Sequence, residues 1–237
     1  VFLAAGFETT MAPVAALLAA GVPANLSLLL AGRRTWPIVA RLLADDAGAC
    51  DALVAPGHVA TVMGPEEWDF VATRHGLPVA VAGFSPASLL AAIAAVVAQR
   101  AAGVARVDNC YPEAVRPGGN ARARALLDTV FAIADADWRG IGTVPASGYA
   151  LRADWAAHDA RRVHGARALP PRRRPGDMPP GCDCARVVLG RIPPDACALY
   201  GTACTPARPI GPCMVSDEGA CHIWWTAGRR RADAALP

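Results

Sequence analysis

Short runs of consecutive apolar residues alternate with longer amphipathic stretches along the first half of the chain. Runs that are apolar at every position are typical of strands buried on both faces, and the stretches between them have the length and start signals of helices. This alternation predicts an α/β fold with mainly parallel, Rossmann-like sheets flanked by helices and joined by right-handed crossovers. The predicted strands are residues 1–5, 26–31, 51–55 and 78–83, and the predicted helices are residues 13–20, 36–43, 66–74 and 86–100. Thr9 or Thr10 is the expected cap of the first helix, and Ser85 that of the last.

The second half of the chain has weaker periodicity. We expect a turn-rich loop over residues 107–120, a helix from Asn120 to about residue 134, an irregular Gly-rich stretch over 138–149 and a short helix over 155–163. Residues 165–181 hold five prolines and four arginines and are a linker by composition. The pattern therefore divides the chain into a remnant of a first α/β domain (1–46), a second α/β domain (47–164), and a linker with a small irregular cysteine-rich domain (165–237).

Composition excludes several classes of protein. The chain is 54% hydrophobic and 18% charged, which is enough to bury a core, and no stretch reaches the 18 apolar residues of a membrane helix. All 23 basic residues are arginine, so a Walker A lysine and a Schiff-base lysine are excluded. The runs Arg172–Arg174 and Arg229–Arg231 are interpreted as a solvated linker and a tail, and no nucleic-acid or membrane partner is expected.

The chain opens at Val1, inside an apolar run that looks like a strand cut at its start. We therefore expect the sequence to be an N-terminally truncated piece of a longer protein. Without an export signal the expected compartment is the cytoplasm. Structural disulfides are rare there, and clustered cysteines more often bind metal or do redox work.

Six of the eight cysteines lie within 40 residues near the C-terminus, namely Cys182, Cys184, Cys197, Cys204, Cys213 and Cys221. The segment has no C-x-x-C knuckle of the kind that zinc ribbons use, and six thiols exceed the four that zinc takes. A [4Fe–4S] cluster takes four thiolates and would leave two cysteines for a redox pair. This chemistry favours an iron–sulfur site, with a zinc site and a disulfide knot as the alternatives.

Four motifs in this sequence occur together in one known family. The run from Cys197 to Cys221 resembles the C-terminal signature of the HypD family of [NiFe]-hydrogenase maturation factors. Upstream, Gly6-Phe7-Glu8-Thr9-Thr10, Pro56-Gly57-His58-Val59 and Trp138-Arg139-Gly140-Ile141-Gly142 match further signatures, in the family's order. The resemblance covers essentially the whole chain.

The resemblance implies roles for the six clustered cysteines. The family's ligand spacing, C-x14-C-x6-C-x16-C, selects Cys182, Cys197, Cys204 and Cys221 as ligands of a [4Fe–4S] cluster. Cys184 and Cys213 would then be a thiol–disulfide pair beside that cluster. Cys50 and Cys110 are interpreted as buried or loop thiols.

Polar residues follow two of the predicted strands. Glu8, Thr9 and Thr10 come after the first strand and His58 after the third, and ligands of open parallel sheets bind outside the carboxyl ends of strands. From the residues alone, a helix-capping threonine and a loop histidine explain the same pattern. The resemblance instead implies that these four residues line the cleft where the iron centre is assembled.

Several family features are missing from this sequence. The family's Cys-Gly-Gly-His-Thr-His stretch, whose cysteine holds the Fe(CN)2CO unit, and a nearby Cys-x-x-Cys pair are not present. The principal iron ligand is thus absent, and the chain as given is not expected to be competent. Residues 83–86 (GFSP) lack a cysteine and an acid that relatives tend to carry, and Cys110 stands where they usually have Gln.

The resemblance implies a maturation scaffold that assembles the Fe(CN)2CO unit with a HypC-like chaperone, receives cyanide from a HypE-like donor, and passes the unit to the hydrogenase large subunit. Electrons would run through the cluster and the cysteine pair, so the protein would be an assembly factor more than a turnover enzyme. The alternatives are a cluster-dependent thiol–disulfide oxidoreductase and a zinc-stabilised α/β binding module.

Overall fold

The cysteine segment and the α/β elements belong to different units of the fold. A computed structural model describes residues 1–45, 50–165 and 178–228. The first unit comprises Val1–Ala136 and Val144–Pro170, and the second comprises Asp137–Thr143 and Pro171–Pro237. Both runs of consecutive arginines and most of the predicted linker lie outside the described residues.

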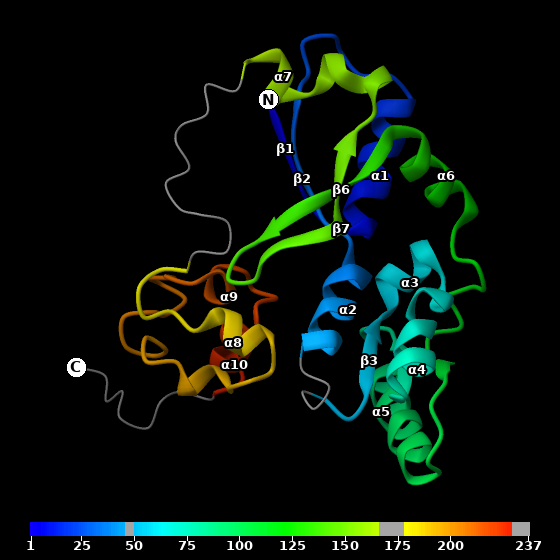
Figure 1. The fold of residues 1–237 in the computed structure, drawn as a ribbon, viewed down its shortest axis with the longest axis vertical. Helices are drawn as coiled ribbons and strands as arrows, with labels where there is room; N and C mark the ends of the chain where they lie inside the picture. The colour runs from blue at the N-terminus through cyan, green and yellow to red at the C-terminus, as the bar shows by residue number, and fades with distance from the viewer. Residues whose placement is uncertain (46–49, 166–177, 229–237) are drawn as a thin grey trace. The chain divides into compact units, whose positions relative to one another are not determined.

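Two parallel strands form the first sheet. β1 (Phe2–Gly6) pairs with β2 (Leu28–Gly32), so that Phe2 lies opposite Leu28 and Gly6 opposite Gly32 (Figure 1). α1 (Glu8–Ala19) is the crossover between them, and it buries Met11 and Leu18 completely. α2 (Thr35–Asp45) follows β2 after a two-residue connection.

Three parallel strands form the second sheet, in the order β3–β4–β5. β4 (Val79–Ala82) is central and buried at every position, between β3 (Leu53–Pro56) and β5 (Val107–Asn109). The fold class is confirmed, because parallel sheets are connected by helices as the apolar runs predicted. The helical connections are α3 (Gly57–Met63), the 3-10 helix η1 (Pro65–Trp68), α4 (Asp69–His75) and α5 (Pro86–Ala101).

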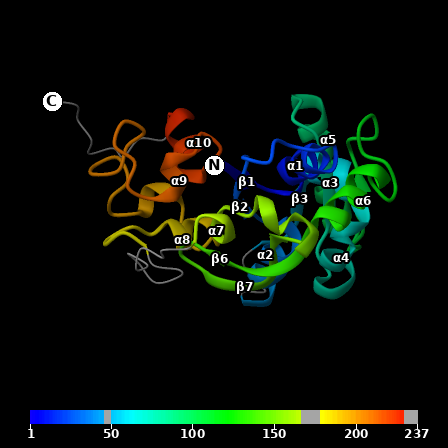
Figure 2. The same cartoon turned by 90° about the horizontal axis from the view of Figure 1, so that it is seen from above.

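The stretch after residue 120 differs from its prediction. α6 (Ala121–Val130) ends four residues early, and β6 (Phe131–Trp138) and β7 (Gly142–Leu151) then lie side by side as a hairpin (Figures 1 and 2). The irregular conformation predicted for residues 138–149 is therefore wrong, as is the loop predicted at β5. In β6, alanines alternate with other residues and carry little hydrophobic contrast. The two-residue alternation that marks a strand is therefore not visible in the sequence there.

Helix starts are partly as predicted. The Ser85 hydroxyl accepts from the Ser88 amide at 3.2 Å, and the Asn120 side chain accepts from the Ala123 amide at 3.0 Å. The threonine cap on α1 is wrong, because the helix already begins at Glu8 with Phe7 as its N-cap residue. After β7, the 3-10 helix η2 (Ala153–His158) and α7 (Ala160–Val163) cover the short helix predicted there.

The helices of the cysteine segment are short over the part that the structure describes, residues 178–228. They are α8 (Cys184–Val188), the 3-10 helix η3 (Pro194–Ala196), α9 (Pro212–Val215) and α10 (Ala220–Thr226). Segments this short cannot bury enough apolar surface alone, so the interior of this unit depends on the groups that its cysteines bring together. Throughout residues 1–45, 50–165 and 178–228, no helix is both long and apolar enough to cross a membrane.

Candidate metal centre

The six clustered cysteines form the interior of the second unit. Five of them are buried and Cys182 is half-buried, and all are free thiols. They pack with Tyr200 and Met214, which are each 1% exposed, and with the partly buried Trp225. Thiols thus occupy the place that aliphatic side chains fill in an ordinary small core.

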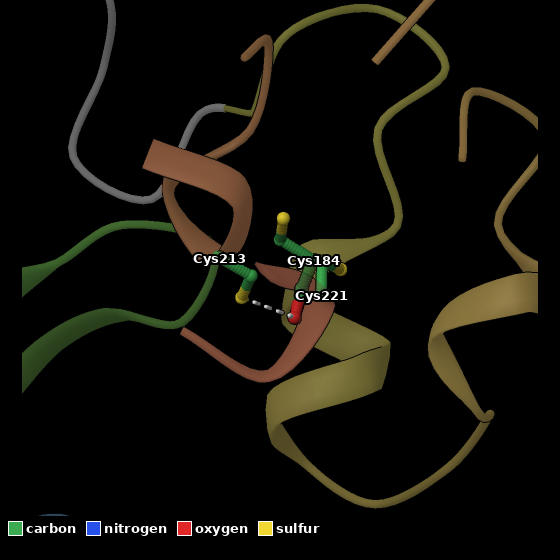
Figure 3. A group of neighbouring side chains, drawn as sticks. All are labelled: Cys184, Cys213 and Cys221. Atoms are coloured by element: carbon green, nitrogen blue, oxygen red, sulfur yellow. Dashed lines mark hydrogen bonds between the residues drawn. The ribbon is translucent and has the colours of Figure 1, made fainter. Parts of the chain in front are cut away.

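Three of these thiols come together most closely. The sulfur atoms of Cys184, Cys213 and Cys221 lie within 4.8 Å of one another (Figure 3). Each residue belongs to a different short helix, α8, α9 and α10 respectively. Cys213 Sγ also lies 3.8 Å from the Cys184 carbonyl oxygen, the contact that is dashed in Figure 3. The triad therefore combines both residues of the predicted redox pair with one predicted cluster ligand.

Gly211 connects Cys182 to this triad. A β-carbon at position 211 would collide with the sulfurs of both Cys182 and Cys184. The two thiols of the C-x-C motif therefore lie on the same side of the Gly211 backbone, just before α9. Sequence reasoning missed this residue, although a Gly-Pro-Cys turn beside a thiol cluster is a usable signal of close backbone approach.

Backbone amides point at the two remaining thiols. The Asp183 amide donates to Cys197 Sγ at 3.5 Å, and the Ile210 amide donates to Cys204 Sγ at 3.3 Å. Both donors come from segments that also carry other cysteines or Gly211. N–H donors of this kind stabilise thiolate ligands, and they tune the reduction potential of a cluster that those thiolates hold.

The protons of the thiols are shared within this core. Hydrogen bonds from Cys184 and Cys221 lower the pKa of Cys213, whereas donating to these neighbours raises the pKa of Cys221. Donation to Cys213 likewise raises the pKa of Cys184. Burial raises the pKa of Cys182 to about 12. The three thiols therefore form one hydrogen-bonded group, in which the pKa of Cys213 is lowered and those of Cys184 and Cys221 are raised.

The donor set fits a thiophilic metal group. Six thiols, five of them buried, are offered together with backbone N–H donors. Ligands of one tetrahedral zinc ion lie about 3.8 Å apart, given Zn–S bonds of about 2.3 Å. Cysteines that hold a [4Fe–4S] cluster each bind a different iron and stand further apart. The triad spacing suits a single ion or a redox-active group of thiols, and the wider set of six is sufficient for a cluster.

The predicted cleft residues have identifiable contacts in the first unit. Glu8 is fully buried, and its carboxylate accepts from the Thr35 amide and the Thr35 hydroxyl, both at 2.7 Å. Glu8 therefore accepts hydrogen bonds from the first residue of α2, at a helix N-terminus where a negative charge is favourable. The Thr10 side chain packs against Gly6, and Thr9 is half-buried within α1.

His58 is exposed at the start of α3, and its ring lies 4.2 Å from that of Phe84, centroid to centroid. These contacts describe Glu8, Thr9, Thr10 and His58 one by one, and their shared cleft stays a prediction. Cys50 and Cys110 are half-buried in the first unit, where burial raises the pKa of each thiol. Neither cysteine belongs to the thiol triad.

Known proteins resemble this chain along nearly all of its length. A sequence model of the HypD family, described as the hydrogenase formation hypA family, matches residues 1–228. The hydrogenase maturation factor HypD of Rhodobacter capsulatus is 37% identical over 98% of this chain. The HypD proteins of Azotobacter vinelandii and Cupriavidus necator are 35% and 36% identical over 98% and 97% of it. The chain spans 62% of the length of each of these relatives. By this family match and these identities, the chain belongs to the HypD family of hydrogenase formation proteins.

Proposed function

We propose that the protein to which this chain belongs is a scaffold on which the Fe(CN)2CO unit of [NiFe]-hydrogenase is assembled. It would work in the cytoplasm with a HypC-like chaperone and a HypE-like cyanide donor, and would serve the hydrogenase large subunit indirectly. The names of the relatives support the hydrogenase maturation role. The iron unit is cargo, whereas a [4Fe–4S] cluster is the resident cofactor that we propose.

Within the second unit, we propose Cys182, Cys197, Cys204 and Cys221 as the cluster ligands. The amides that donate to Cys197 and Cys204 support this assignment, because such donors accompany thiolate ligands. The collision of a residue-211 side chain with Cys182 supports a fixed position for that thiol. When bound, the cluster would supply one-electron transfer.

Cys184 and Cys213 are the proposed redox pair. The observation that carries this proposal is the triad, because both sulfurs lie within 4.8 Å of Cys221 Sγ, which belongs to a proposed ligand. A disulfide between Cys184 and Cys213 would take up two electrons and two protons to give two thiols. Contact with a cluster ligand would let those electrons pass one at a time.

Glu8, Thr9, Thr10 and His58 are proposed to line the cleft that receives the iron cargo. Their places at the ends of β1 and β3, on the carboxyl side, support this proposal. Since Glu8 is buried and bonded to Thr35, its proposed contribution is to fix the end of β1 against α2 rather than to touch the cargo directly.

Anaerobic purification with metal analysis tests the cofactor. A brown protein with about four iron and four sulfide per chain is expected. Alanine substitution of Cys182, Cys197, Cys204 or Cys221 should each remove most of the iron. Serine substitution of Cys50 or Cys110 is the matched control and should leave it unchanged. A colourless protein that holds zinc would refute the cluster.

The same preparation tests the redox pair. Cys184→Ser and Cys213→Ser should keep the iron but abolish a reversible change of two reactive thiols per chain on oxidation. If these two variants lose the iron and the Cys182 variant keeps it, the ligand assignment is wrong.

A cluster-dependent thiol–disulfide oxidoreductase is the second candidate, and the same triad favours it. Infrared spectra of the full-length protein, purified with its chaperone, separate the two. Cyanide and carbonyl bands support the scaffold. Reduction of a protein disulfide without such bands supports the oxidoreductase.

A further inference from the structure

A cavity of about 520 Å³ lies within the first unit. Its walls come from the start of α2, from η1 and α4, from α6 and from the β6–β7 hairpin. None of the predicted cleft residues and none of the eight cysteines lines it within the described parts of the chain. Cavities of about 300–1,000 Å³ are typical of sites for small organic ligands.

Three arginines line this cavity, namely Arg34, Arg74 and Arg124. Arg34 donates to the Ala146 carbonyl oxygen at 2.9 Å, and Arg124 donates to the Gly118 carbonyl oxygen at 2.8 Å. Within residues 1–45, 50–165 and 178–228, none of the three forms an ion pair with a carboxylate. Arg34 also bonds to Tyr149 in the same wall, and because a guanidinium group has five N–H donors, further donors remain for a ligand.

Three carboxylates line the cavity with these cations, namely Glu66, Glu67 and Asp128, and the charges of Arg34 and Arg124 act on Glu67 without forming an ion pair with it. Both oxygens of Glu66 accept from the Gly118 amide, at 3.1 and 3.0 Å. Glu67 Oε1 is buried without a hydrogen-bond partner among the described residues, and burial raises the pKa of this carboxyl group. A buried oxygen without a partner is costly, and a ligand that donates an N–H or O–H to it would remove that cost.

Flat aromatic surfaces complete the wall. The Arg34 guanidinium carbon lies 5.3 Å from the centroid of the Trp36 ring, and Phe70 packs edge-on to Trp36 with centroids 6.0 Å apart. Tyr149, which is 9% exposed, lines the same space. Aromatic rings and stacked guanidinium groups together suit a planar ligand.

We propose that this cavity binds a planar organic anion, with its carboxylate or phosphate on Arg74 and Arg124, its ring beside Trp36, and a donor group on Glu67. A planar organic anion with a donor group uses the arginines, the aromatic rings and Glu67 together. An inorganic anion would leave the rings and Glu67 unused. A neutral ring would leave the arginines unused. This site goes beyond the proposed maturation role and depends on none of the thiols.

Calorimetric titration of the anaerobically purified protein tests the site. Adenosine monophosphate and 4-aminobenzoate both carry a ring, an amino donor and an anion, and they separate the phosphate source from the carboxylate source. Adenosine lacks the anion and inorganic phosphate lacks the ring. One of the two complete probes should bind saturably, and at least about 10-fold more tightly than its incomplete counterparts, as the loss of charge-assisted bonds predicts.

Substitutions locate the binding. Arg74→Gln and Arg124→Gln should each weaken the better probe by about 10- to 100-fold. Arg122→Gln, an exposed arginine on the same helix as Arg124 that does not line the cavity, should leave binding unchanged. Circular dichroism checks that each variant is folded, and Arg74 is exposed at the end of α4, so its loss should not affect folding.

Two outcomes overturn the proposal. One is the absence of saturable binding by either complete probe at millimolar concentration. The other is binding that survives both Arg74→Gln and Arg124→Gln. Because iron and sulfide are measured on the same samples, failure here is distinguishable from failure of the cluster assignment.

Discussion

The contact between Glu8 and Thr35 joins the start of α1 to the start of α2, and replacing Glu8 should destabilise the first unit. The Glu8 carboxylate is fully buried and accepts two hydrogen bonds of 2.7 Å, from the Thr35 amide and from the Thr35 hydroxyl. Hydrogen bonds to a charged group contribute about 1.5–3 kcal/mol each. Because Glu8→Ala also leaves two donors without a partner, we expect a loss of about 3–5 kcal/mol.

A double-mutant cycle separates this contact from general damage. Thr35→Val removes only the hydroxyl donor and should cost about 1.5–3 kcal/mol in the natural background, but almost nothing when Glu8 is already alanine. Glu113→Ala, at an exposed glutamate of the same unit, is the matched control and should change stability by less than about 0.5 kcal/mol.

Urea unfolding followed by circular dichroism under anaerobic conditions measures these differences. A cost below about 1 kcal/mol for Glu8→Ala, or additive losses in the cycle, would refute the reasoning. The result also matters for the proposed cleft, because any loss of maturation in a Glu8 variant must first be corrected for the fraction of unfolded protein.

Three further changes have defined outcomes. Gly211→Ala should displace Cys182 and Cys184 and lower the iron content of the protein. Ala207→Ser, at an exposed position nearby, is the control and should leave the iron content unchanged. Unchanged iron in Gly211→Ala would contradict the close approach of these two sulfurs to the Gly211 backbone. Burial raises the pKa of Glu67 in the folded state above its value in the unfolded state. The protein therefore loses stability as pH rises from the unfolded-state pKa through the folded-state pKa. Glu67→Gln should therefore be more stable than the natural protein at pH 7 and lose this advantage below about pH 4, which unfolding midpoints across that range would check. Asn120→Ala should lower the free energy of unfolding by about 1 kcal/mol, because α6 loses its N-cap hydrogen bond, whereas Asn120→Asp should keep most of that stabilisation. Equal losses of stability in the two variants would contradict the capping role of Asn120.

Much of the fold follows from local pattern. The strands at 2–6, 28–32, 53–56 and 79–82 are continuous apolar runs, and the caps at Ser85 and Asn120 are short-range chemistry. The hairpin is different, because Ala132, Ala134 and Ala136 favour a helix locally and nevertheless lie in the strand β6. The choice there is made by pairing with residues 142–151, which the helix or strand propensity of residues 131–138 alone does not express.

The candidate sites show the same limit. Spacing drew attention to the six cysteines, but which sulfurs meet depends on how α8, α9 and α10 pack. The arginines of the cavity stand some 40 to 50 positions apart in sequence and belong to no motif, so only the folded chain brings Arg34, Arg74 and Arg124 around one space.

The discontinuous second unit has a consequence for synthesis. The hairpin tip, Asp137–Thr143, groups with the cysteine segment, and a side chain at Gly140 would collide with Ala185. A ribosome adds about 5–20 residues per second, so the tip emerges roughly 4 to 16 s before Cys221, about 80 residues later, is made. A fragment that starts at residue 171 would lack the tip altogether. The proposed cluster could therefore be bound only after Cys221 is made, and the hairpin tip is a part of the second unit that the chain makes well before its cysteines.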